Sequence, residues 1–213
     1  MSTATTIRPA GPSPSPHRIT VDEYERIIKV GALEDPSRVE LIDGEMVDKM
    51  GKNAAHRWAT KEVLKALEGR LPTGWTSQKE EPVRIPLYDE PEPDVAILRG
   101  SDSDYEFRIP GASDVALLVE VSATTPSQDR GKKLSAYARG GIPLSWIVNL
   151  VDRQIEVYSR PGKNGYRSHK TFGSGEQVPV AIGGQKLPVI TVDSLLPHRE
   201  PTRGNDEPKG NRA

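Results

Sequence analysis

Two apolar segments of the sequence each carry a carboxylate where a buried strand is expected. Asp94 stands near the start of the run 93–98, and Glu120 lies within the run 115–122. Charged side chains seldom occupy continuous apolar strands unless they are paired or bind a metal. Mg²⁺ takes oxygen ligands, commonly one or two carboxylates together with water and substrate phosphate. The two acids therefore predict a divalent-cation site suited to chemistry on a phosphodiester.

A lysine-containing helix is expected directly after the second acid, over residues 127–139, closed by Gly140-Gly141. A lysine beside a metal can orient or deprotonate an attacking water, or stabilise developing negative charge. Lys133 has helical spacing to Tyr137, which we expect in the core. Its spacing to Asp129 is equally that of an ordinary surface ion pair. Both interpretations of Lys133 remain open on spacing alone.

Other polar residues near these segments also have two interpretations. Glu40, across a predicted turn from Glu45, is either a third carboxylate of the site or an outward-facing hairpin residue. His56, on a predicted helix, either helps to bind metal or substrate or is solvated. Ser122 either packs beside the metal or ends a strand. A second group is either a local phosphate-facing patch or a solvated helix face: Arg130, Lys132 and Arg139.

The elements that must position these residues alternate between helices and strands. Thr20-Val21-Asp22-Glu23 is a capping box for a helix that ends near Gly31, and Asn53 can cap a second helix to about residue 71. Asp43-Gly44 predicts a hairpin between 38–42 and 45–47. Further strands are expected over 83–87, 94–98, 115–121, 145–149 and 154–158, around Tyr166, and over 187–192. This order predicts an α+β (mixed α/β) fold with a central mixed sheet flanked by helices.

Composition narrows the class of protein. The 213 residues suit one domain, which we place at 18–197 between disordered tails at 1–17 and 198–213. The absence of cysteine excludes disulfides, zinc–thiolate sites and thiol catalysis. A net charge of −1 means that DNA binding requires a local patch. No segment has the character of a membrane span or a secretory signal, so we expect no membrane association and a cytoplasmic location.

Four blocks in consistent order resemble the Uma-type (Uma-two) restriction endonucleases, a branch of the PD-(D/E)XK nuclease superfamily. The blocks are 39–45 followed by His56, then 92–95, 118–122 and 129–148. The resemblance covers roughly 20–195 and implies a restriction-endonuclease-like core. It also implies an endonuclease that cleaves DNA with Mg²⁺ (or Mn²⁺).

The same resemblance assigns roles to individual residues. It implies that Asp94 and Glu120 are the metal carboxylates and that Glu40 is the additional upstream acid. The sequence departs from the general superfamily pattern at one position. The usual lysine lies two residues after the second acid, where this chain has Ser122. The resemblance moves that role to Lys133 in the following helix, next to Lys132.

Two further functions compete with a metal-dependent endonuclease. The neutral net charge and the displaced lysine fit a catalytically inactive nuclease-fold domain that binds nucleic acid or a protein partner. A metal-free hydrolase with two carboxylates, as in glycoside cleavage, is a weaker alternative, because aromatic sugar platforms are not evident in a chain with 5% aromatics. The residues themselves do not distinguish DNA from RNA. We expect a homodimer, since cleavage of both strands suits two-fold symmetry.

Overall fold

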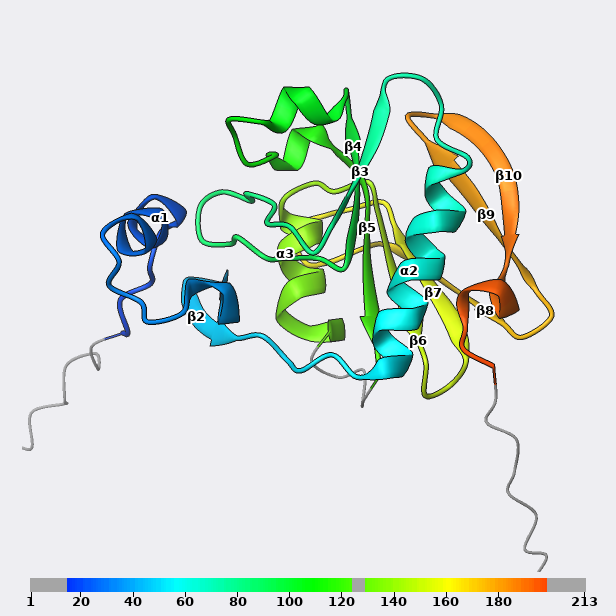
Figure 1. Cartoon of the computed structure of the whole chain (residues 1–213), viewed down its shortest axis with the longest axis horizontal. Helices are drawn as coiled ribbons and strands as arrows, with labels where there is room; N and C mark the ends of the chain where they lie inside the picture. The colour runs from blue at the N-terminus through cyan, green and yellow to red at the C-terminus, as the bar shows by residue number, and fades with distance from the viewer. Residues whose placement is uncertain (1–14, 124–128, 199–213) are drawn as a thin grey trace, which may run out of the picture.

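A mixed sheet lies at the centre of the computed structural model, which describes residues 15–123 and 129–198. Helices cover both faces of this sheet (Figure 1). The disorder expected for 1–17 and 198–213 falls almost entirely outside the described residues, so the domain boundaries stay a prediction. Within the described residues, no helix is long and apolar enough to cross a membrane.

The central sheet has six strands in the order β3-β4-β5-β6-β7-β8. The strands are β3 (Trp75–Lys79), β4 (Val95–Arg99), β5 (Val115–Ser122), β6 (Leu144–Asn149), β7 (Gln154–Ser159) and β8 (Ser168–Gly173). Only β5 and β6 pair in parallel, and the other neighbours are antiparallel. A parallel pair needs a crossover, and η4 (Asp129–Lys133) with α3 (Leu134–Arg139) lies on it. The sequence-based prediction of a mixed sheet is confirmed.

Strands β4 and β5 are buried because each face of the sheet is covered by a different helix. On one face Val95 and Val119 pack in the same core cluster as Val63 of α2 (Ala54–Glu68). On the other face Leu118 belongs to a cluster with Tyr137 of α3. Figure 1 shows α2 and α3 on opposite sides of the sheet. Glu120, two residues after Leu118, therefore points to the α3 side.

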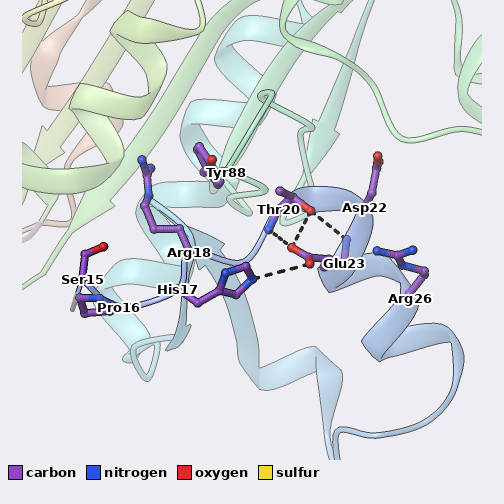
Figure 2. Close-up of a pocket in the computed structure, with 9 residues that line it drawn as sticks. All are labelled: Ser15, Pro16, His17, Arg18, Thr20, Asp22, Glu23, Arg26 and Tyr88. Atoms are coloured by element: carbon purple, nitrogen blue, oxygen red, sulfur yellow. Dashed lines mark hydrogen bonds and ion pairs between the residues drawn. The ribbon is translucent and has the colours of Figure 1, made fainter.

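The N-terminal part begins with α1 (Val21–Lys29), whose predicted capping box is confirmed. The Thr20 side chain accepts a hydrogen bond from the Glu23 N–H, and the Glu23 carboxylate accepts one from the Thr20 N–H. Figure 2 shows this cap beside a shallow pocket, with His17 next to Glu23. The predicted hairpin is also present, following η1 (Pro36–Arg38), as β1 (Val39–Ile42) and β2 (Glu45–Asp48). Its turn places Asp43 and Gly44 at φ of 54° and 77°.

A second hairpin completes the cover on the α2 side of the sheet. It consists of β9 (Gln177–Ile182) and β10 (Gln185–Thr191), joined by Gly183-Gly184 and followed by η5 (Val192–Leu195). Its buried residues join the core cluster of α2. Two short 3₁₀ helices, η2 (Asp102–Tyr105) and η3 (Ala112–Asp114), lie in the loop between β4 and β5.

Several sequence-based element predictions were wrong. The segment 83–87 forms isolated bridges rather than a strand, because Pro86 interrupts it, and Leu87 is 59% exposed. The strand expected around Tyr166 begins only at Ser168. By contrast, the strand expected over 187–192 is present as part of β10, which pairs with β9 in a separate two-stranded sheet. The helix expected over 127–139 starts outside the described residues, and Gly131 interrupts it with φ −90° and ψ −110°.

Candidate active site

Antiparallel pairing of β4 with β5 brings the two predicted metal carboxylates together. The register pairs Val95 with Val119, so Asp94, one residue earlier, faces Glu120, one residue later. Residues directly opposite in an antiparallel pair share one face and have Cβ atoms about 4.5–5.5 Å apart. Asp94 is 4% exposed and Glu120 is 5% exposed. The pairing of these buried strands therefore places the two acids next to each other on one face of the sheet.

Asp94 is surrounded by donors of hydrogen bonds and positive charge. Its Oδ2 accepts a 2.7 Å hydrogen bond from the Val121 N–H and lies 3.1 Å from His56 Nε2. Its Oδ1 lies 3.5 Å from Lys52 Nζ. Burial alone would raise the pKa of Asp94, but His56, the Val121 N–H and Lys52 together hold that pKa below its usual value. The carboxylate is consequently stabilised in its ionised form.

Glu120 has a different environment on the α3 side. Its Oε1 accepts a short hydrogen bond from the Tyr137 hydroxyl and lies 3.4 Å from Lys133 Nζ. Burial raises the pKa of Glu120 to about 8, although the charge of Lys133 opposes the increase. Tyr137 is in the core as expected, and it also holds an oxygen of Glu120 in place.

Lys133 points into the site. Its Nζ lies 3.0 Å from Glu40 Oε2 and 3.4 Å from Glu120 Oε1, and its side chain is 17% exposed. Burial lowers the pKa of Lys133, but the two carboxylates outweigh burial and raise it above its usual value. The geometry thus brings together Glu40, Glu120 and Lys133, while the side chain of Asp129 lies outside the described part of the chain.

The remaining sequence candidates have different positions. The structure places His56 against Asp94, and Ser122 is buried at the end of β5. Lys132 turns outward, with a 55% exposed side chain that pairs with Glu45. Arg139 is also paired with acids, and the Arg130 side chain is outside the described residues. The described cations of the expected patch therefore already have acidic partners.

Sequence reasoning missed two residues of the site. Lys52 Nζ lies 3.2 Å from Glu80 Oε1 as well as 3.5 Å from Asp94 Oδ1. Glu80 adopts φ 56°, and its N–H donates a 3.2 Å hydrogen bond to the Asp94 carbonyl oxygen. Lys52 lies in an irregular linker with no periodicity, so only its position beside the helix cap Asn53 could have drawn attention to it.

Several of these residues line one pocket of about 540 Å³. Its polar lining includes Glu40, Lys52, His56, Asp94, Glu120 and Lys133. Among the described residues, no group of three or more His, Cys, Asp or Glu is arranged to hold a metal ion. The fit to a cation rests on Asp94 and Glu120, and two carboxylates are what Mg²⁺ commonly takes from a protein. The all-oxygen character of this pair suits a hard cation such as Mg²⁺ or Mn²⁺.

Comparison with known proteins supports the fold and identifies the family. No curated protein sequence matches the chain. The fold is similar to that of a putative nuclease belonging to DUF820 from Anabaena variabilis ATCC 29413, with a TM-score of 0.62 and 16% identity over 83% of this chain and 97% of that chain. The model of the Uma2 family, described as putative restriction endonuclease, matches residues 21–190. Since that match spans most of the chain, the protein belongs to the Uma2 family, and this membership supports a nuclease function.

Proposed function

We propose that the protein is an endonuclease that hydrolyses phosphodiester bonds of DNA with Mg²⁺ (or Mn²⁺). The observation that carries this proposal is the convergence of Asp94, Glu120 and Lys133 in one pocket. Two facing carboxylates can bind a cation, and a lysine within 3.4 Å of one of them can act on the adjacent water or phosphate. Family membership supports the reaction class.

Asp94 and Glu120 are the proposed metal ligands, and Glu40 assists them. When bound, the divalent cation supplies Lewis-acid chemistry that polarises the scissile phosphate and makes water more acidic. The Val121 N–H fixes Asp94 Oδ2, and the Tyr137 hydroxyl fixes Glu120 Oε1. These hydrogen bonds orient the carboxylates before substrate arrives, which limits the reorganisation needed during reaction.

The two lysines have separate proposed roles. Lys133 Nζ, between Glu40 and Glu120, orients the attacking water and stabilises negative charge on the phosphate oxygens. Lys52, which is held by Glu80 and lies beside Asp94, contacts the phosphate. Water forms the new P–O bond while the bond to the leaving sugar oxygen breaks, and that oxygen takes up a proton. Each lysine would thereby exchange a carboxylate contact for a phosphate contact.

A non-cleaving domain that binds nucleic acid or a protein partner is the second candidate. It is favoured by the contacts of Lys52 and Lys133 with the carboxylates that a metal would need. For a metal to bind, Lys52 and Lys133 would have to move away from these carboxylates. Homodimer formation and a cytoplasmic location stay predictions of the sequence.

Cleavage of supercoiled plasmid DNA with Mg²⁺, Mn²⁺ or EDTA tests the proposal. We expect metal-dependent nicking that falls by about 100-fold or more in Asp94→Asn and Glu120→Gln, because both changes remove negative charge from the proposed metal site. Glu106→Gln is the matched control, since Glu106 is exposed and outside this pocket. Cleavage that survives both site substitutions would contradict the assignment. Absence of cleavage with every metal would favour the binding domain.

A further inference from the structure

The outward side of α2 carries three cations in a row. Arg57, Lys61 and Lys65 are exposed and follow one another at intervals of four residues. Side chains at this spacing lie one above the other on a helix. With a rise of 1.5 Å per residue, the row is about 12 Å long. We call these three residues the α2 basic ridge.

No acid neutralises the ridge within the described part of the chain. Arg57 donates a 2.6 Å hydrogen bond to the Lys52 carbonyl oxygen, and the described structure gives none of the three ridge residues an ion pair. Lys61 has cations four residues away in both directions. Like charges at this spacing destabilise a helix. The arrangement is therefore unfavourable for the helix alone and favours an external anion.

The acids of α2 do not change this conclusion. Glu62 is half-buried, and Glu68 accepts a 2.7 Å hydrogen bond from the Ser77 hydroxyl on β3. Helix α1 shows the contrasting case, because its acids Asp22 and Glu25 both pair with Arg84. The chain as a whole has a net charge of −1. The ridge is thus a local concentration of positive charge on a protein that is not basic as a whole.

The ridge is continuous with the candidate active site. Lys52, Asn53 and His56, at the start of α2, line the pocket, and Arg57 is the next residue of the helix. Figure 1 shows α2 on the outside of the sheet, with its first turn at the end where the chain arrives from β2. The ridge therefore starts one residue beyond the pocket lining and leads away from the pocket along the helix axis.

We infer that the α2 basic ridge binds the phosphate backbone of duplex DNA beyond the cleavage position. This inference rests on the proposed nuclease function, which places the scissile phosphate in the pocket. Successive ridge cations are about 6 Å apart along the helix. Each strand of a duplex presents one negative charge per about 3.4 Å of its axis. A strand that leaves the pocket along α2 would meet all three cations.

Charge reversal on the ridge tests the inference. The variant combines Arg57→Glu, Lys61→Glu and Lys65→Glu. The matched control makes the same change of charge with Lys29→Glu, Lys163→Glu and Lys170→Glu, three exposed positions away from this helix. Circular dichroism and thermal unfolding check the folding of both variants. A milder variant, with glutamine at the three ridge positions, is measured in the same way.

Binding of a labelled duplex of about 30 base pairs is measured by fluorescence anisotropy in EDTA over a series of salt concentrations. We expect the Kd of the ridge variant to rise by about tenfold or more. The slope of log K against log salt should become shallower by about 2 to 3, since each lost phosphate contact contributes about 0.9. The control should change the Kd by less than about twofold.

Equal affinity and equal salt slope in the ridge and control variants would overturn the inference, even if the wild type cleaves DNA. Binding of single-stranded RNA in preference to the duplex would also overturn it. Cleavage of the same duplex after addition of Mg²⁺ reports separately on the proposed function. A ridge-dependent salt slope without cleavage would support the ridge and contradict the nuclease.

Discussion

Two buried carboxylates in this protein, Asp94 and Glu90, are stabilised in opposite ways. In the candidate active site, the acids lie against the cationic side chains Lys52 and Lys133. Under α1, Glu90 is only 5% exposed, and its Oε2 has no hydrogen-bond partner among the described residues. Burial and the neighbouring acid Glu25 raise the pKa of Glu90 to about 7, against the opposing charge of Arg84.

Burial of an acid does not by itself indicate a functional site. Asp94, which is buried beside cations, keeps its charge, and those partners can be exchanged for a metal ion and a phosphate. An acid that is buried beside another acid is stabilised by a proton instead. Judged by burial alone, Glu90 and Asp94 would be equally good candidates for a metal ligand. The charges around Asp94 and Glu90 account for the opposite directions of their pKa shifts.

Among the changes considered, removal of the Lys133 side-chain charge should have the largest effect, and the affected quantity is the rate of DNA cleavage. We expect Lys133→Met to reduce DNA cleavage by about 10²- to 10⁴-fold, the usual range for loss of a positioned acid or base. The matched control is Lys163→Met, because Lys163 is exposed and does not line the pocket. Single-turnover cleavage of the two folded variants measures the effect. Similar rates in both variants would contradict the role of Lys133.

Glu90→Gln should change how stability depends on pH. The folded-state pKa of about 7 lies above the usual glutamate pKa of 4.5, so the folded protein binds this proton more tightly. The contribution of Glu90 to stability is therefore complete below about pH 4.5 and is lost as the pH rises through 7. After allowance for solvent screening, the loss is on the order of 2 kcal/mol.

Glutamine imitates the protonated acid, so Glu90→Gln should gain stability relative to wild type between pH 5 and pH 8. Urea unfolding at the two pH values measures this gain, with the exposed Glu81→Gln as the control. A difference between variant and wild type that is the same at both pH values would show that Glu90 does not hold a proton.

Tyr137→Phe should have the smallest effect. The substitution removes the hydrogen bond to Glu120 but keeps the buried ring. We expect a loss of about 1 kcal/mol in stability and a several-fold increase in the Mg²⁺ concentration needed for half-maximal cleavage. Tyr166→Phe is the control, because the Tyr166 hydroxyl donates a 2.9 Å hydrogen bond to the Ile142 carbonyl oxygen instead. An equal shift in metal requirement for both variants would argue against a role for Tyr137 in positioning Glu120.

The acids of the site could be predicted because they interrupt apolar strands. Asp94 and Glu120 stand out against runs that are otherwise suited to a buried sheet, and the β4–β5 register brings them together. Lys133 was different, since helical spacing alone also allowed a surface pair with Asp129. The resemblance to the Uma-type family favoured the inward position, and the contacts with Glu40 and Glu120 agree with it.

Other parts of the fold and site could not be predicted because their local sequence has no periodic signal. Strand β3 has the sequence Trp-Thr-Ser-Gln-Lys and lies at the edge of the sheet, where its residues are mostly half-buried. No alternation of apolar residues therefore marks it. Conversely, 83–87 alternates but contains Pro86 and bends into a turn. Lys52 and Glu80 meet only through tertiary packing. A long-range contact between two irregular segments leaves no trace in spacing.

Delivery of the lysine from η4 rather than from β5 has a consequence for protein engineering. When acid and lysine share one strand, the pleat alone sets their separation, and any redesign of one disturbs the other. Here Glu120 belongs to the ladder and Lys133 to a crossover segment that contains the non-helical Gly131. The position of the lysine therefore depends on how the crossover packs on the sheet, which it does through Tyr137, and not on the pleat of β5.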